Sequence, residues 1–204
     1  MNLIEKIHGQ CVFQRRVMVI AGHLAALLPR NASVLDVGCG DGSLAKLIQD
    51  HRPDVRIRGI DVLVRPQTAI PVESFDGTHI PVADGSYDVV MFVDVLHHTD
   101  DPLVLLREAR RVTRQSILLK DHTRNGFLAG PTLRFMDGVG NARYGVALPY
   151  NYWPREQWQA AFRELDLKVE TWQQKLGLYP AWADWLFGRS LHFVARVDVL
   201  QAVK

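Results

Sequence analysis

Glycines occupy every second position from 38 to 42, with acidic residues at 36 and 41, and this pattern could hold a small ligand against the main chain. The segment 34–42 reads VLDVGCGDG. An apolar, β-branched run that ends in glycines and opens into helix-forming sequence predicts a strand, a tight turn and a helix. Glycine allows a sharp turn and lets a ligand approach the backbone, because no Cβ stands in the way. We therefore expect a ligand site at this turn.

The carboxylates of Asp36 and Asp41 narrow the choice of ligand. A dinucleotide fingerprint needs a third glycine where this chain has Ser43, and the turn lacks the Gly-Lys-Ser/Thr of a phosphate-binding loop. Two carboxylates would also repel a pyrophosphate. A cationic, nucleoside-like ligand fits better, so a nicotinamide-dependent oxidoreductase is disfavoured.

A further carboxylate follows at an interval that suits a ribose. The run 56–60 is predicted to be a second strand and ends at Asp61, roughly 20 residues beyond the turn, where a carboxylate can accept hydrogen bonds from both ribose hydroxyls. The segments 72–77 and 80–88 then lead into an apolar strand at 89–93. An ordinary strand-to-helix turn followed by a solvated aspartate is the alternative reading of these residues.

Together, residues 34–121 resemble the class I S-adenosylmethionine-dependent methyltransferases, most closely the small-molecule branch typified by the quinone-biosynthesis enzymes. The resemblance implies that S-adenosylmethionine is the cofactor. It places the turn around the methionine part, Asp61 on the ribose, Val62 against the adenine, Asp76 at the adenine amino group and Asp94 where the backbone touches the cofactor. The cofactor-binding residues that it implies are Asp36, Gly38, Cys39, Gly40, Asp61, Val62, Asp76, Gly77 and Asp94.

Methyl transfer from a sulfonium is an in-line displacement, so the protein mainly positions the reactants and excludes water. A hydroxyl acceptor would gain from a general base, and His98 and His122 are the catalytic candidates because both follow predicted strands. A helix-cap or packing role is the alternative for each. Asp94, His97, His98, Asp121 and His122 could converge on a metal ion, but their spacing matches no standard ligand motif, so no metal site is predicted.

The elements that must position these residues alternate between strands and helices, which predicts a doubly wound α/β domain. The resemblance implies a Rossmann-like, seven-stranded, mostly parallel sheet with an antiparallel terminal strand pair. Further strands are expected at 116–121, 167–174 and 191–197. Helices are expected at 10–28, 43–50, 155–165 and from Asp100 to Thr113, with Leu103, Leu106, Ala109 and Val112 on one face of the last.

We expect a single domain over residues 1–204. Residues 1–30 form a helical segment, 33–121 the cofactor-binding core, 122–153 a lid or substrate segment, and 154–204 the terminal helix and strand pair. A surface loop with a helix around 131–136 is the alternative for the third part. The aromatic insertion 176–189, with Tyr179, Trp182 and Trp185, could line a substrate pocket, pair two subunits or touch a membrane surface, and core packing is equally compatible.

Composition sets the remaining limits. The chain has 204 residues, 48% of them hydrophobic, with a net charge of +2. Such a chain is typical of one soluble globular domain and gives no reason to expect a nucleic-acid partner. Two cysteines predict no disulfide framework and favour the reducing cytoplasm. The expected activity is methyl transfer to a small apolar or aromatic molecule. A catalytically inactive cofactor-binding or regulatory protein is the alternative, because Pro66 and Pro71 shorten the crossover after Asp61.

Overall fold

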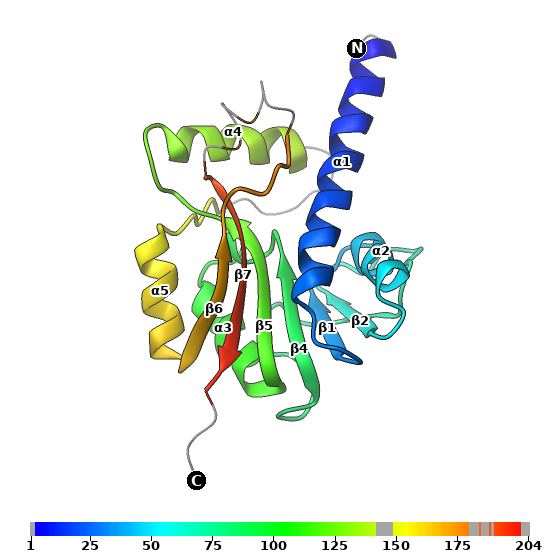
Figure 1. Ribbon diagram of the computed structural model, residues 1–204, viewed down its shortest axis with the longest axis vertical. Coiled ribbons are helices and arrows are strands. Elements are labelled where there is room, and N and C mark those ends of the chain that lie inside the picture. Colours follow the sequence, from blue (N-terminus) through cyan, green and yellow to red (C-terminus); the bar gives the residue numbers. More distant parts are fainter. Residues whose placement is uncertain (1–2, 142–148, 180–183, 185–187, 189, 201–204) are drawn as a thin grey trace.

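Seven strands form one mixed sheet in the order β3-β2-β1-β4-β5-β7-β6 (Figure 1). The computed structural model describes residues 3–141, 149–179, 184, 188 and 190–200, and only the backbone of residues 3–13 and 139–141. The strands are β1 (Ser33–Val37), β2 (Arg56–Asp61), β3 (Val72–Ser74), β4 (Tyr87–Val93), β5 (Thr113–His122), β6 (Leu167–Gln173) and β7 (His192–Val199). The first five strands are parallel, and β7 runs antiparallel to both β5 and β6. The predicted fold class is confirmed.

Helices cover both faces of this sheet. They are α1 (Leu3–Leu27), α2 (Ser43–His51), α3 (Pro102–Val112), α4 (Ala129–Asn141) and α5 (Arg155–Glu164), with a 3-10 turn, η1, at Leu96–His98. Alternate strand residues face opposite sides, so Val89 and Met91 pack with α1 and α2, while Val90 and Phe92 pack with α3 and α5. Both faces are therefore buried, as a mostly parallel sheet requires.

Local sequence explains where the helices begin and end. Asp101 caps α3 by accepting a hydrogen bond from the Leu103 amide at 2.9 Å, and Pro102 occupies the first turn. The carboxyl end of α1 is held by the Arg52 guanidinium, whose Nη1 donates to the carbonyls of Ala25 (2.7 Å) and Leu28 (3.0 Å). A cation at a helix carboxyl end satisfies free carbonyls and complements the helix dipole.

Several predicted boundaries shift in the structure. α1 begins before residue 10, and β5 extends beyond 116–121 at both ends. Of the residues expected on one face of α3, Leu106, Ala109 and Val112 are buried and Leu103 is partly buried against the same core cluster, to which Leu105 also belongs. Leu105 lies four and seven residues before Ala109 and Val112, which puts all three on one helical face. The segment between β2 and β3 contains no helix, as Pro66 and Pro71 predicted.

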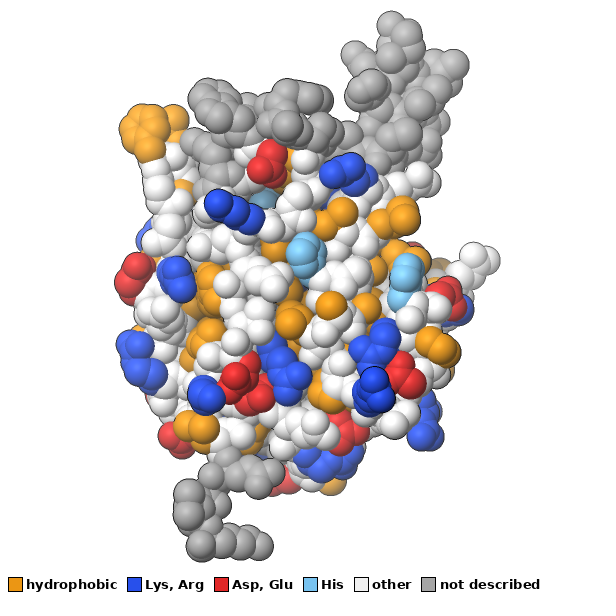
Figure 2. Space-filling view, viewed as in Figure 1, with side chains coloured by type: hydrophobic (Ala, Val, Ile, Leu, Met, Phe, Trp, Pro, Cys, Tyr) orange, Lys and Arg blue, Asp and Glu red, His pale blue; other side chains and the backbone are white. Residues whose placement is uncertain are grey.

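The segment predicted as a lid or substrate segment contains α4, which crosses the end of the sheet near the carboxyl ends of β4 and β5 (Figure 1). In the aromatic insertion, Tyr179 is buried, whereas Trp182 and Trp185 lie outside the described residues. Positive and negative side chains intermingle on the face shown in Figure 2. Within the described part of the chain, none of the helices is both long and apolar enough to cross a bilayer.

Candidate functional site

The glycine turn lies at the carboxyl end of β1, and its three glycines differ in how closely the protein packs around them. Gly38, Gly40 and Gly42 have φ angles of 73°, 61° and 74°, which favour glycine. A Cβ on Gly38 would lie 2.6 Å from Val95 Cγ2, and one on Gly42 would lie 2.5 Å from Ile70 Cγ1. A Cβ on Gly40 would have no described atom within 4 Å. The protein's own packing therefore fills the space at Gly38 and Gly42, whereas the space at Gly40 is open to a ligand.

Asp61 is fixed beside this open space by two backbone amides. Its Oδ2 accepts a hydrogen bond from Gly40 N at 2.8 Å, and its Oδ1 accepts one from Leu63 N at 2.8 Å. An ionised carboxylate has about four lone-pair sites, so both oxygens can still accept from ligand hydroxyls. The turn and the end of β2 are thus tied together with the Asp61 carboxylate already oriented.

Asp36 lies in β1 just before the turn and is only 3% exposed. Its Oδ1 is buried without a hydrogen-bond partner among the described residues. Burial, together with the nearby charge of Asp61, raises the pKa of Asp36 to about 7. A buried carboxylate without a partner destabilises the fold, so a cationic or hydrogen-bond-donating ligand would be favoured here.

The implied adenine-binding residues lie beyond β2. Val62 is 63% exposed, and its Cγ1 would lie 3.1 Å from a Cβ on Gly77. Asp76 Oδ1 accepts hydrogen bonds from the amides of Thr78 and His79, both at 2.7 Å, and these bonds lower the pKa of Asp76. The structure thus brings Val62 and Gly77 together, and the Asp76 carboxylate stabilises the loop that follows it by accepting these hydrogen bonds.

Cys39 does not point into the open space at Gly40. Its Sγ covers Gly59 of β2 so closely that a Cβ on Gly59 would lie 2.3 Å away. Burial and the charges of Asp36 and Asp61 raise the pKa of the Cys39 thiol, so the thiol stays protonated. The side chain of Cys39 therefore packs the turn against β2.

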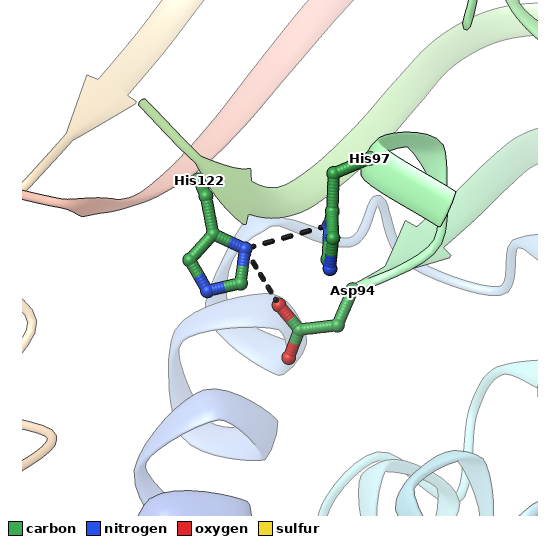
Figure 3. Close-up of side chains that lie close together, drawn as sticks. All are labelled: Asp94, His97 and His122. Atoms are coloured by element: carbon green, nitrogen blue, oxygen red, sulfur yellow. Dashed lines mark hydrogen bonds and ion pairs between the residues drawn. The ribbon is translucent and has the colours of Figure 1, made fainter. Parts of the chain in front are cut away.

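A second polar cluster lies where β4 and β5 end. The Lys120 side chain is fully buried, and its Nζ donates to Asp94 Oδ1. His122 Nδ1 lies 3.7 Å from Asp94 Oδ1 and 3.4 Å from His97 Nδ1 (Figure 3). Parallel strands place the residues after β4 and the last residues of β5 at one edge of the sheet. The structure therefore brings together Asp94, His97 and His122, three of the five residues that the sequence analysis considered as possible metal ligands.

The histidines of this cluster differ in their affinity for a proton. Burial and the charges of Lys120 and His97 lower the pKa of His122 to about 4, so His122 is neutral at pH 7. Burial also lowers the pKa of His98. Burial opposes the charge on His97 as well, but the neighbouring carboxylates, Asp121 first, outweigh it and raise the pKa. His98 and His122 are consequently weak bases in this environment.

His97 is the centre of this cluster, although sequence reasoning named it only as one of several metal candidates. It is 1% exposed, and its Nδ1 lies 2.6 Å from Asp121 Oδ1. Its Nε2 lies 3.4 Å from Asp137 Oδ2 on α4, and the Tyr152 hydroxyl donates to the same carboxylate oxygen. Sequence reasoning missed Asp137, because its approach to His97 depends on how α4 folds back over the sheet.

A cavity of about 610 Å³ opens beside these histidines. The Tyr152 ring connects the two, since it lines the cavity and its centroid lies 5.5 Å from that of His97. Arg134 lies above the Tyr150 ring, 5.6 Å from its centroid. The lining residues are Arg124, Gly126, Leu128, Ala129, Gly130, Pro131, Arg134, Tyr150 and Tyr152. The cavity therefore combines aromatic walls with two guanidinium groups.

Comparison with known proteins places this site in context. The model of the methyltransferase domain family matches residues 10–171. A 27-O-demethylrifamycin SV methyltransferase from Amycolatopsis mediterranei is 30% identical over 110 residues, which are 47% of this chain and 40% of that protein. A ubiquinone biosynthesis O-methyltransferase from Sodalis glossinidius is 28% identical over 94 residues, 40% of this chain and 37% of that protein. The chain thus spans well under half of either relative.

The fold resembles solved structures along nearly its whole length. A SAM-dependent methyltransferase from Thermotoga maritima superposes with a TM-score of 0.66 at 17% identity, covering 97% of this chain and 96% of the other. At this identity, the likeness shows a shared fold.

Proposed function

This chain belongs to the methyltransferase domain family, in which S-adenosylmethionine is the methyl donor, and on that premise we propose that it methylates a small aromatic molecule. The relatives with which it shares the family include an O-methyltransferase of ubiquinone biosynthesis. That relative's name supports a hydroxyl oxygen as the acceptor atom of the present protein.

The observation that carries this proposal is the open space at Gly40, whose amide donates to the Asp61 carboxylate, together with the buried carboxyl of Asp36 near Asp61. Asp61, held by the amides of Gly40 and Leu63, would accept hydrogen bonds from the ribose hydroxyls. Asp36, whose buried Oδ1 lacks a partner among the described residues, would face the cationic methionine part. Val62 and Gly77 would flank the adenine, with Asp76 at its amino group. When bound, S-adenosylmethionine supplies a methyl group already activated by its positively charged sulfur.

The acceptor would occupy the cavity between α4 and the segment after β5. Tyr150 and Tyr152 offer aromatic surfaces to an aromatic ring. Arg124 and Arg134 are exposed in the same cavity and can form bidentate bonds to a carboxylate or phosphate. We therefore propose an aromatic hydroxy acid, or a phosphorylated phenol, as the acceptor class.

His98 and His122 are proposed to orient the acceptor rather than to remove its proton completely. Their lowered pKa values keep both imidazoles neutral at pH 7, so each can accept a hydrogen bond from a hydroxyl. The same lowered values make them weak bases. Because the methyl donor is already activated, orientation and exclusion of water would supply most of the rate enhancement.

The test is a turnover assay with paired acceptors. The protein and S-adenosylmethionine are incubated with phenols that either carry or lack a ring carboxylate, and formation of S-adenosylhomocysteine is followed with the mass of the methylated product. We expect turnover of the carboxylated phenols. Arg134→Gln should raise their KM about tenfold, the scale for losing one charge-assisted hydrogen bond, while Arg163→Gln on α5 serves as the control.

Two results would contradict the proposal in different ways. Cofactor binding without methyl transfer to any phenol or to labelled cell-extract components would favour the inactive, regulatory alternative. Turnover that is indifferent to Arg124→Gln and Arg134→Gln would leave the activity standing but remove the anionic acceptor class.

A further inference from the structure

We propose that His97, His98 and Asp137 form a binding site for a divalent transition-metal ion at the edge of the cavity. Each of these residues offers one ligand atom, and the three atoms lie within 4.8 Å of one another. They come from η1 and α4, two elements that the chain brings together only in the folded state. The site is distinct from the glycine turn and from the residues proposed to bind the cofactor.

The first argument for this site is that two of its ring nitrogens are buried without a hydrogen-bond partner. His97 Nε2 and His98 Nδ1 have no hydrogen-bond partner among the residues that the structure describes. The His97 side chain is only 2% exposed, so water cannot easily replace a missing partner. Buried polar atoms are nearly always satisfied, and an imidazole nitrogen becomes a metal ligand when a bound cation displaces its proton.

The second argument is the way in which His97 is oriented. Its Nδ1 lies 2.6 Å from Asp121 Oδ1, which leaves Nε2 to point toward Asp137. Asp121 is itself fixed, because its carboxylate accepts hydrogen bonds from the amides of Leu96 (3.1 Å) and His122 (2.7 Å). A carboxylate that holds the far nitrogen of a histidine is the usual second shell of a metal site, where it sets the tautomer of the ligand.

The third argument concerns Asp137. Its side chain is largely buried, and its Oδ2 accepts a hydrogen bond from the Tyr152 hydroxyl. Ligating carboxylates are commonly held by such hydrogen bonds. Because Tyr152 also lines the cavity, an ion at this site would lie next to the space proposed for the acceptor.

A neighbouring set of residues, Asp94, His97 and His122, has donor atoms just as close together (Figure 3). Its carboxylate, however, already accepts from the buried Lys120 ammonium and lies 3.9 Å from the Arg16 guanidinium. A metal cation there would be repelled by two positive charges at short range. The geometry therefore favours the set that contains His98 and Asp137.

The donor set also indicates the kind of ion. Two imidazole nitrogens and one carboxylate oxygen suit Zn²⁺, Fe²⁺, Co²⁺ or Ni²⁺, whereas Mg²⁺ and Ca²⁺ prefer sites made of oxygen ligands. Three protein ligands leave at least one coordination position open to water or a substrate oxygen. That open position could bind the acceptor hydroxyl and lower its pKa, and this contact would replace the direct hydrogen bond proposed above for His98. This role, unlike metal binding itself, rests on the proposed function.

The experiment titrates the full-length, chelator-treated protein, free of any histidine tag, with Zn²⁺ in competition with a chromophoric chelator. We expect one equivalent to bind. His98→Gln and Asp137→Asn should each weaken binding at least tenfold, and His51→Gln on the exposed side of α2 should leave it unchanged. With Co²⁺, the wild-type protein should give the ligand-field absorption of an ion bound by nitrogen and oxygen ligands. This measurement uses the wild-type protein alone, so it does not depend on whether the variants fold.

Absence of stoichiometric Zn²⁺ and Co²⁺ binding by the wild-type protein would overturn the inference. It would also be overturned if His122→Gln abolished binding while His98→Gln did not, because the ion would then occupy the Asp94 set. S-adenosylmethionine binding is measured in parallel on the chelated protein. If the wild-type protein binds S-adenosylmethionine but no metal ion, only the metal site is refuted. If it binds the metal ion but not S-adenosylmethionine, only the proposed function is refuted.

Discussion

At the scale of single residues, two carboxylates beside the glycine turn differ in how they are satisfied. Both oxygens of Asp61 accept backbone hydrogen bonds, whereas Asp36 Oδ1 has no partner among the described residues. Asp61 is therefore ready to accept further hydrogen bonds from a ligand, and Asp36 would be stabilised by a ligand that brings a donor or a positive charge. This difference predicts separate effects when each is changed to asparagine.

Asp61→Asn should weaken binding of S-adenosylmethionine by about 1 to 3 kcal/mol, the scale for hydrogen bonds to a charged group. The amide nitrogen of asparagine cannot accept, so either Gly40 N or Leu63 N also loses its partner. Isothermal titration of the variant and of Asp50→Asn, an exposed position on α2, provides the comparison. An affinity equal to that of the Asp50 control would refute the ribose assignment.

Asp36→Asn should alter the pH dependence of folding stability. The pKa of Asp36 rises from 3.8 to about 7 on folding, so between these values the folded state holds a proton that the unfolded state has lost. The wild type is thus most stable with respect to this group below about pH 4 and loses stability as the pH rises toward 7. The asparagine of the variant does not titrate. The free energy of unfolding of the variant, relative to that of the wild type, should therefore increase by about 2 to 4 kcal/mol from pH 5 to pH 8. Urea unfolding at both pH values measures this, and a constant difference would contradict it.

Part of the site could be predicted from sequence because its residues lie close together along the chain. Asp36, the glycines and Asp61 belong to one strand-turn-helix-strand unit, in which spacing alone fixes their neighbourhood. Asp137 could not be predicted, since no local pattern shows that α4 returns to η1. The roles implied for the cofactor-binding residues remain predictions.

At the scale of elements, α1 is held against the sheet by a stripe of buried residues at helical spacing. Ile20 and Leu24 of α1, and Leu28 just after its end, pack against β-strand residues of one face, and Arg52 donates hydrogen bonds to carbonyls at the end of the helix. The helical periodicity of these residues predicted α1. Its first residue was not predicted, because the apolar pattern is weak in the residues before position 10. Segments without a strong period, such as 122–153, were predicted less well, because α4 is placed by its contacts rather than by its own sequence.

Leu24→Ala should lower the free energy of unfolding by about 2 to 5 kcal/mol, since Leu24 is fully buried and its truncation leaves a cavity between α1 and the sheet. Met18→Ala on the same helix should cost much less, because Met18 is 61% exposed. Chemical unfolding of the two variants checks this. Equal losses would show that α1 is not packed on the sheet as described.

At the scale of the whole molecule, two hydrophobic clusters lie on opposite faces of one sheet and share its strands. β4, β5 and β7 each contribute residues to both clusters. Loss of either cluster exposes one face of the same strands, so the two faces should unfold together. The doubly wound layers could be inferred from the alternation of elements, and the seven-stranded sheet with its antiparallel terminal pair from the family resemblance. The cavity could not be inferred, since it depends on side chains from distant segments.

Leu24→Ala should therefore lower the unfolding midpoint measured by tryptophan fluorescence as much as the midpoint measured by circular dichroism. Trp153 and Trp158 belong to the cluster on the other face, so a fluorescence change would report cooperation across the sheet. Two separate midpoints would instead indicate that the faces unfold independently.

The central claim is that the glycine turn and Asp61 bind S-adenosylmethionine, and isothermal titration of the wild-type protein tests it most directly. We predict saturable binding of one S-adenosylmethionine per chain with a dissociation constant in the micromolar range, roughly −8 kcal/mol. Under the same conditions, NAD should give no saturable heat, because the turn lacks the third glycine of a dinucleotide site. No binding of S-adenosylmethionine at high micromolar concentration, or binding of NAD in its place, would contradict the account.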